Sequence, residues 1–219
     1  MLGRFTFLSA VIGAQLLSAG SFFILKRKMQ GKIPPGSITN DNLVSNEKSN
    51  APGTLWSRAG VSFSMGYSML VLLAVEFFYI LDFWEDIAHY LAFDLPYLVN
   101  LIGLIGIWLY YIWGTATMLY SPTYIPLWEE LPRERYILAT GGPYSIIRHP
   151  MYVAKGIVLP VLIFFTTGTW TVVFVMLGWI FFPYQAESEE KLLVKRFGEI
   201  YTDYAAKTGK FLPHLRKTR

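Results

Sequence analysis

Long stretches without a charged residue constrain this chain more than any other feature. No Asp, Glu, Lys or Arg occurs from Phe5 to Leu25 or from Leu95 to Trp128. A helix of about 20 apolar residues, rising about 1.5 Å per residue, crosses the hydrocarbon core of a bilayer. Charged residues make up only 16% of the 219 positions, against about 25% in a typical soluble domain. The sequence therefore predicts an all-α, polytopic membrane protein.

We expect about five transmembrane helices in a single integral membrane domain that covers residues 1–219. Thr167-Gly168-Thr169 separates the last two apolar runs, which are short and predict a tight helical hairpin. The polar residues 187–219 are expected to form a cytoplasmic helical region that completes a site. Residues 30–54 are rich in Gly, Pro, Ser and Asn, and predict a mobile polar loop to which we assign no function. The expected spans are residues 5–25, 61–81, 97–119, 150–167 and 170–186.

The distribution of basic residues predicts how the chain sits in the membrane. Of the 19 Lys and Arg residues, all except Arg4 fall within residues 26–58, 133–155 or 191–219. Alternating spans place these three segments on one side, which the positive-inside rule makes cytoplasmic. The N-terminus is then expected outside and the C-terminus inside. The net charge of +4 thus indicates topology and not nucleic-acid binding.

Polar residues gather on both sides of the predicted hairpin. Arg148 and His149 precede it, Glu189 and Glu190 follow it, and a hairpin brings its two ends to the same membrane surface. Helical spacing places Glu190 on an apolar stripe and rotates Glu189 by about 100° from it. A carboxylate on such a stripe, where a helix leaves the membrane, needs a cationic partner or a ligand. The other members of the stripe are Pro183, Ala186, Leu193 and Phe197.

Two readings of this cluster stay open on the residues alone. One is a structural ion pair between Arg148 and Glu190. The other is a site for a small zwitterionic ligand, whose ammonium or sulfonium group would meet the carboxylates and whose carboxylate would meet the basic side chains. No metal site is expected, because His89 follows Glu85 by one helical turn without a third ligand in reach and the chain has no Cys. Glu76 is an intramembrane carboxyl whose role is left open.

A series of short motifs in the C-terminal half gives a family resemblance. Residues 140–215 carry Gly142-Pro143-Tyr144, Arg148-His149-Pro150 with Tyr152, Glu189-Glu190 with Leu193, Phe197-Gly198, Tyr201, Tyr204 and Phe211-Leu212-Pro213. In order and spacing, this segment resembles the superfamily of isoprenylcysteine carboxyl methyltransferases and phospholipid N-methyltransferases, which are integral membrane enzymes. The resemblance covers about a third of the chain.

The resemblance implies a methyltransferase that uses S-adenosyl-L-methionine. It implies a catalytic role for Arg148 and Glu190, the first to orient an anionic acceptor and the second to take a proton if the acceptor is an amine. The substrate is expected to be a lipophilic small molecule or a prenylated group that arrives from the bilayer at the cytoplasmic face. The residues expected to bind the cofactor are Tyr144, His149, Tyr152, Glu189 and Glu190.

The first choice of reaction is carboxyl O-methylation of the isoprenylcysteine type, with phospholipid amine N-methylation as an alternative. A second alternative is a membrane sterol or enone reductase that uses NADPH, since that group resembles the same pattern. Here, however, residues 197–201 lack the cysteine and tryptophan usual in those reductases. A third alternative is a non-catalytic membrane scaffold. The methyl acceptor and the oligomeric state are left open.

Overall fold

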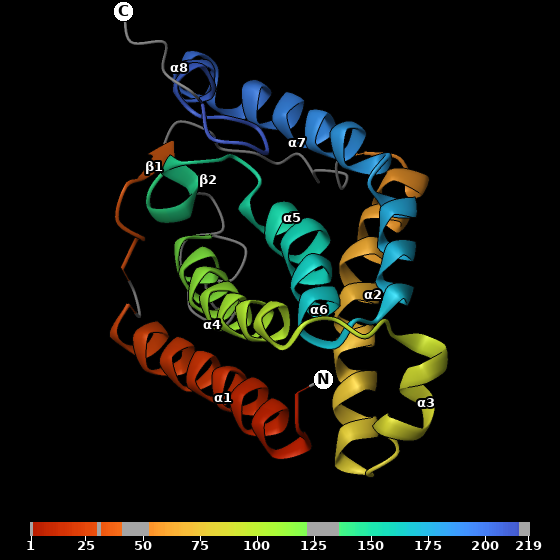
Figure 1. Cartoon of the computed structure of the whole chain (residues 1–219). Coiled ribbons are helices and arrows are strands. Elements are labelled where there is room, and N and C mark those ends of the chain that lie inside the picture. Colours follow the sequence, from red (N-terminus) through yellow and green to blue (C-terminus); the bar gives the residue numbers. More distant parts are fainter. Residues whose placement is uncertain (1, 30–31, 41–52, 122–135, 215–219) are drawn as a thin grey trace, which may run out of the picture.

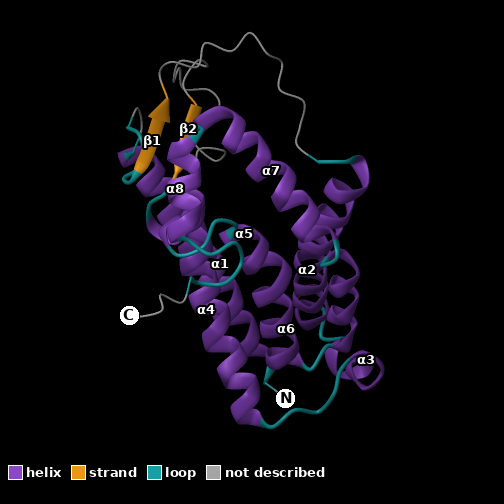
Figure 2. Cartoon of the chain, turned by 90° about the horizontal axis from the view of Figure 1, so that it is seen from above, coloured by secondary structure: helices purple, strands orange, loops and turns teal. Residues whose placement is uncertain are grey.

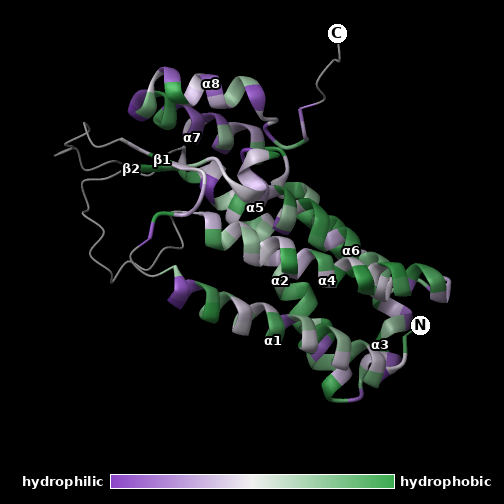
Figure 3. Cartoon of the chain, turned by 90° about the vertical axis from the view of Figure 1, so that its left-hand side faces the viewer, coloured by the Kyte–Doolittle hydropathy of each residue, from purple (hydrophilic) through white to green (hydrophobic). Residues whose placement is uncertain are grey.

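The computed structural model is a helical bundle with a small two-stranded sheet at one end (Figures 1 and 2). It describes residues 2–29, 32–40, 53–121 and 136–214. The predicted all-α membrane fold is confirmed, and the hydrophobic residues concentrate on the long helices while α7 and α8 are more hydrophilic (Figure 3). Four helices in the described ranges are long and apolar enough to cross a membrane: α1 (Arg4–Lys28), α2 (Leu55–Ile80), α4 (Tyr97–Tyr120) and Pro150–Thr167.

The fifth expected span differs from the structure. Residues 170–186 do not form one transmembrane helix, because a 3-10 helix, η4 (Trp170–Gly178), is followed by α7 (Phe181–Phe197). The two segments still return along the bundle, since η4 packs against α2 and α6, and α7 packs against α2. Gly168 makes the turn at φ 73°, where a Cβ atom would stand 2.0 Å from the Phe93 carbonyl oxygen. The hairpin is therefore present, and its second wall leaves the bundle as α7.

The first wall of the hairpin contains a π-helical turn. Pro160 has no N–H to donate to the Gly156 carbonyl, four residues earlier. The Trp179 indole N–H donates to that carbonyl instead, at 2.6 Å. A Cβ atom on Gly156 would stand 2.2 Å from the Phe182 ring, so only glycine allows this approach. The wall runs through α5 (Pro150–Val153), the π turn (Ala154–Val158) and α6 (Leu159–Thr167).

The main apolar core lies between the long helices. α1 packs against α4, and α4 packs against α6. At the end of the bundle opposite the sheet, Arg4 pairs with Asp82 at 2.9 Å and donates to the Ile80 carbonyl. The short helix α3 (Trp84–Leu91) lies next to this end. Fully buried core side chains are Phe7, Leu72, Ile107, Leu159 and Ile163.

The sheet corrects part of the expectation for residues 30–54. Strand β1 (Ser37–Asn40) belongs to that segment and pairs antiparallel with β2 (Tyr136–Ala139), so these residues are not a loop without structure. Residues 41–52 of the predicted loop lie outside the described ranges. The sheet packs on the C-terminal region through Leu138, which is buried against Phe197 and Tyr201. A second, smaller core therefore holds β2, α7 and α8 (Glu199–Lys207) together.

Candidate active site

The C-terminal segment fixes the chain just before α5. The Arg148 N–H donates to the Gly209 carbonyl at 2.8 Å, and the His149 N–H donates to the Lys210 carbonyl at 3.1 Å. Pro150 then begins α5, with His149 at the N-cap position. These main-chain bonds set the direction in which the two basic side chains leave the backbone.

Both glutamates of α7 face the segment that leads into α5. The sequence wheel placed Pro183 on the apolar stripe with Glu190, and this part of the prediction is wrong. Pro183 is exposed, and Glu189 contacts Tyr152 of α5 and the N-cap residue His149. The buried face of α7 passes through Phe182 instead of Pro183, but it keeps Ala186 and Phe197 of the predicted stripe. Buried residues of α7 are Phe182, Gln185, Ala186 and Phe197.

Three basic side chains surround Glu190. Its Oε1 accepts from Arg148 Nε at 2.8 Å and lies 3.2 Å from His149 Nε2. Its Oε2 lies 3.0 Å from Lys210 Nζ. Burial alone would raise the pKa of Glu190, but the hydrogen bonds with His149, Arg148 and Lys210 lower it to about 2. Glu190 is therefore ionised at neutral pH and has cationic partners on both oxygens.

Glu189 has neutral donors on one oxygen and an open side on the other. Its Oε1 accepts from the Tyr152 hydroxyl at 2.5 Å and from Gln185 Nε2 at 3.1 Å. Within the described part of the chain, its Oε2 meets only His149 Nδ1, at 3.5 Å. Burial opposes ionisation, but the hydrogen bonds with His149, Tyr152 and Gln185 outweigh it and lower the pKa of Glu189.

His149 lies between the two carboxylates. One ring nitrogen faces each glutamate, and both nitrogens can donate only in the imidazolium form. Burial lowers the pKa of His149, while the hydrogen bonds with Glu189 and Glu190 raise it, and the net change is upward. The ring is 8% exposed and stacks on Tyr152 with centroids 5.3 Å apart.

Arg148 also binds the C-terminal end of α8. Its Nη1 donates to the Ala205 carbonyl at 2.9 Å and to the Thr208 carbonyl, where a cation complements the helix dipole. Nearby, the Tyr204 hydroxyl donates to the Tyr144 carbonyl at 2.6 Å and holds the 3-10 helix Gly142–Ser145 against α8. Among the described residues, Arg148 Nη2 has no hydrogen-bond partner.

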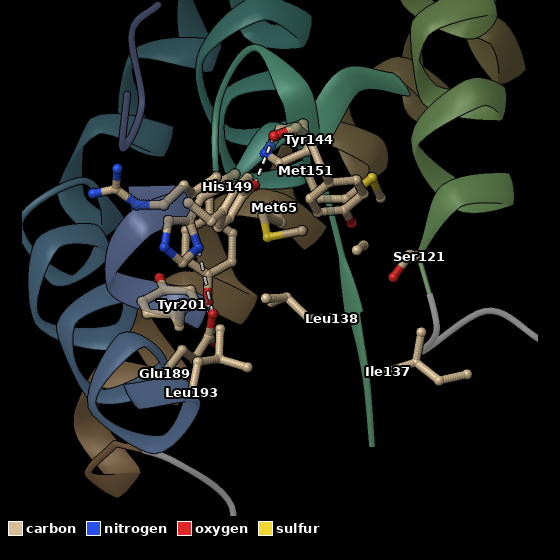
Figure 4. A pocket seen from close by; sticks show the side chains of 15 residues that line it. Met65, Ser121, Ile137, Leu138, Tyr144, His149, Met151, Glu189, Leu193 and Tyr201 are labelled. Carbon is tan, nitrogen blue, oxygen red and sulfur yellow. Dashed lines mark hydrogen bonds and ion pairs between the residues drawn. The ribbon is translucent and has the colours of Figure 1, made fainter. Parts of the chain in front are cut away.

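These residues border a cavity of about 310 Å³, at the lower end of the range of small-molecule sites, about 300–1,000 Å³. In Figure 4, His149 and Glu189 lie on one side of it and Ile137 and Ser121 on the other. Glu190 does not border the cavity but holds the basic side chains behind it. Lining residues are Met65, Ser121, Ile137, Leu138, Ala139, Tyr144, Arg148, His149, Pro150, Met151, Tyr152, Glu189, Leu193, Tyr201 and Tyr204.

The six predicted site residues thus meet at one place, and sequence reasoning missed several of their neighbours. Lys210 binds Glu190, Gln185 binds Glu189, and Met65 brings α2 to the cavity. Gln185 carries a usable signal, because it precedes Glu189 by one helical turn. No sequence signal identifies Lys210 or Met65, because only the tertiary packing brings them to the site.

Glu76 lies elsewhere. It is 6% exposed, accepts from Gln15 Nε2 at 2.5 Å and does not border the cavity. It therefore joins α1 to α2 within the bundle. Over the described ranges, no group of three or more Asp, Glu or His residues is arranged to hold a metal ion.

Comparisons with known proteins give two partial relatives. Methanethiol S-methyltransferase from Pseudomonas deceptionensis is 38% identical over 77 residues, which are 34% of this chain and 28% of that protein. A nickel-cobalt-cadmium resistance protein from Alcaligenes xylosoxydans xylosoxydans is 30% identical over 115 residues, 52% of this chain and 49% of that protein. No family model and no solved structure matches. The chain thus covers less than half the length of either relative and shares a segment with a methyltransferase.

Proposed function

We propose that this chain is an integral membrane methyltransferase that uses S-adenosyl-L-methionine and methylates a lipophilic acceptor. One observation carries the proposal: Glu189 Oε2 is the carboxylate oxygen without a strong partner, and it belongs to a residue that borders the cavity. An open carboxylate suits a sulfonium or ammonium group. The partial similarity to a methyltransferase supports the same activity.

The donor set fits the cofactor. Glu189 would take a cationic group of S-adenosyl-L-methionine, while the rings of Tyr144 and Tyr152 would flank the cofactor and His149 would hold Glu189 in place. When bound, the cofactor supplies a methyl group on a positively charged sulfur. The residues around the cavity would align the acceptor with that methyl group, since in-line displacement depends on reacting atoms about 3–3.5 Å apart.

Glu190 supports a carboxylate acceptor over an amine. An amine acceptor has to lose a proton, and a carboxyl with a pKa of about 2 and three cationic partners is a poor base. A carboxylate acceptor needs no base, and Arg148 Nη2 is available to orient it. Within our proposal, Glu190 therefore acts by positioning Arg148 and His149. Carboxyl O-methylation of the isoprenylcysteine type stays our first choice, ahead of phospholipid N-methylation.

We further propose that the site faces the cytoplasm. The basic ends of α1 and α7 lie at the same end of the bundle as the cavity, and Arg4 lies at the opposite end. By the positive-inside rule, the N-terminus would be outside and the C-terminus inside.

Titration calorimetry on the detergent-purified full chain tests the cofactor. We expect binding of S-adenosyl-L-methionine and S-adenosylhomocysteine, and none of NADPH. Binding of NADPH alone would refute the proposal and indicate a reductase. Binding of none of the three ligands would indicate a non-catalytic scaffold.

A transfer assay then tests the acceptor. With methyl-labelled cofactor, we expect label on N-acetyl-S-farnesylcysteine and none on its preformed methyl ester. Label on phosphatidylethanolamine instead would indicate a phospholipid N-methyltransferase. Label on methanethiol instead would indicate the reaction named for the partial relative, S-methylation of methanethiol.

A further inference from the structure

Glu189 is supported by a chain of buried side chains that leads away from the cavity. Gln185, one turn earlier in α7, donates its amide N–H to Glu189 Oε1 at 3.1 Å. The amide oxygen of Gln185 accepts from the Ser57 hydroxyl at 2.8 Å. Gln185 and Ser57 are each 4% exposed. The chain thus connects the carboxylate at the cavity to the first turn of α2.

The direction of these hydrogen bonds follows from the chemistry of each group. An ionised carboxylate only accepts, so the Gln185 amide has to turn its NH₂ toward Glu189 and its oxygen toward Ser57. Ser57 is itself fixed, because Thr54 caps α2 by accepting from the Ser57 N–H at 3.1 Å. A Cβ atom on Gly53 would stand 2.1 Å from the Gln185 amide oxygen, so the backbone also restricts this side chain.

Two donors on the same oxygen decide which oxygen is left for a ligand. Gln185 and Tyr152 both donate to Glu189 Oε1, and Oε2 keeps only the 3.5 Å contact with His149. Without Gln185, rotation of the carboxylate would let either oxygen turn toward Tyr152. Glu190 has no such choice, since cations occupy both of its oxygens.

We infer that Gln185, held by Ser57, is a positioning residue that orients Glu189 so that Oε2 faces the bound ligand. The inference rests on the proposed cofactor use. Among the described residues, the groups that face Glu189 are Tyr152 from α5, its N-cap residue His149, and Gln185 from α7 itself. Arg148 and Lys210 act on the neighbouring Glu190. Gln185 itself touches neither cofactor nor acceptor in this account.

The experiment measures S-adenosylhomocysteine affinity of the full chain by calorimetry, with Gln185→Leu, Gln185→Glu and Ser57→Ala. We expect Gln185→Leu to lose about tenfold, the size of one hydrogen bond to a charged group. Ser57→Ala should lose less, because the amide stays but can rotate. Ser188→Ala, a neighbour in α7 whose hydroxyl bonds only the Tyr184 carbonyl, is the matched control and should bind like wild type.

Gln185→Glu separates positioning from a merely structural role. At pH 8 two carboxylates would face each other and affinity should fall more than tenfold below wild type. At pH 5 the introduced carboxyl shares a proton with Glu189 and can donate, so the ratio to wild type at the same pH should recover. A loss that is equal at both pH values, or Gln185→Leu affinity within twofold of wild type, would overturn the inference. Wild-type protein that binds no S-adenosylhomocysteine would instead overturn the proposed function, and this inference with it.

Discussion

Removing the charge of Glu190 should destabilise the fold, although Glu190 does not border the cavity. Glu190→Gln keeps the shape of the side chain and removes its negative charge. Arg148, His149 and Lys210 would then stand together without the carboxylate that all three contact within 2.8–3.2 Å. Breaking a buried ion pair on one side leaves uncompensated charge, which is the costly way to lose such a pair.

The pKa of Glu190 sets the magnitude. It falls from an ordinary value of 4.5 to about 2, and each pKa unit corresponds to about 1.4 kcal/mol. That shift sets an upper limit of about 3 kcal/mol, and because solvent reaches part of Glu190 and screens its charge, the ionised carboxylate contributes about 2 kcal/mol to folding. Because the pKa is lower in the folded state, this contribution is fully present above pH 4.5 and is lost as the pH falls toward 2. At pH 7, we expect Glu190→Gln to lose about 2 kcal/mol of unfolding free energy.

Reversible unfolding in mixed detergent micelles, followed by tryptophan fluorescence at pH 7, measures this loss. Glu187→Gln is the matched control, since Glu187 lies on the same helix and forms an exposed ion pair with Lys191. The control should unfold like wild type. A loss below about 1 kcal/mol for Glu190→Gln, the size of a surface ion pair, would refute the reasoning that Glu190 is the anchor of the site.

Three further predictions concern other parts of the molecule. The pKa of His149 is raised on folding, so protonated His149 stabilises the fold fully below its ordinary pKa, and this contribution is lost as the pH rises through the raised value. The unfolding free energies of wild type and His149→Gln should therefore converge at high pH. Gly156→Ala should cost about 1–3 kcal/mol through overpacking against α7, measured against Gly66→Ala, where a Cβ atom meets nothing within 4 Å. Because the chain has no Cys, Asp86→Cys in sealed cells should react with an impermeant maleimide and Ser188→Cys should not; the reverse pattern would invert the proposed topology.

The membrane helices could be predicted from sequence because lipid imposes a simple rule. A helix that crosses hydrocarbon needs about 20 apolar residues whatever it packs against, and α1, α2 and α4 follow this rule. The hairpin was predictable for the same reason, and with it the meeting of residues 148–149 and 189–190. The sequence does not predict geometry that depends on contacts between residues distant in the chain.

Three features show this limit. In the π turn, the Gly156 carbonyl accepts a hydrogen bond from the Trp179 indole, and no local sequence pattern predicts that contact. Strand β1 needs β2, whose residues lie about a hundred positions away, so a short polar segment looked like a loop. The contact between Glu189 and Tyr152 depends on how α7 packs beside α5, and helical spacing within α7 does not determine that packing.

The balance of charge at the site adds an argument about the acceptor. Arg148 and Lys210 balance the two negative charges of Glu189 and Glu190, so protonation of His149, which both carboxylates favour, gives the cluster an excess of one positive charge. S-Adenosyl-L-methionine would add a further positive charge, because its sulfonium and ammonium groups outnumber its carboxylate. In a partly buried site, where charges are weakly screened, this excess attracts an anion and repels an ammonium group. An acceptor that arrives as a carboxylate would neutralise part of this excess positive charge. During methyl transfer, the carboxylate and the sulfonium would both become neutral, and a site that excludes water favours such a loss of charge. The same electrostatics disfavours a protonated amine, so the charge count and the weak basicity of Glu190 independently support the same class of acceptor.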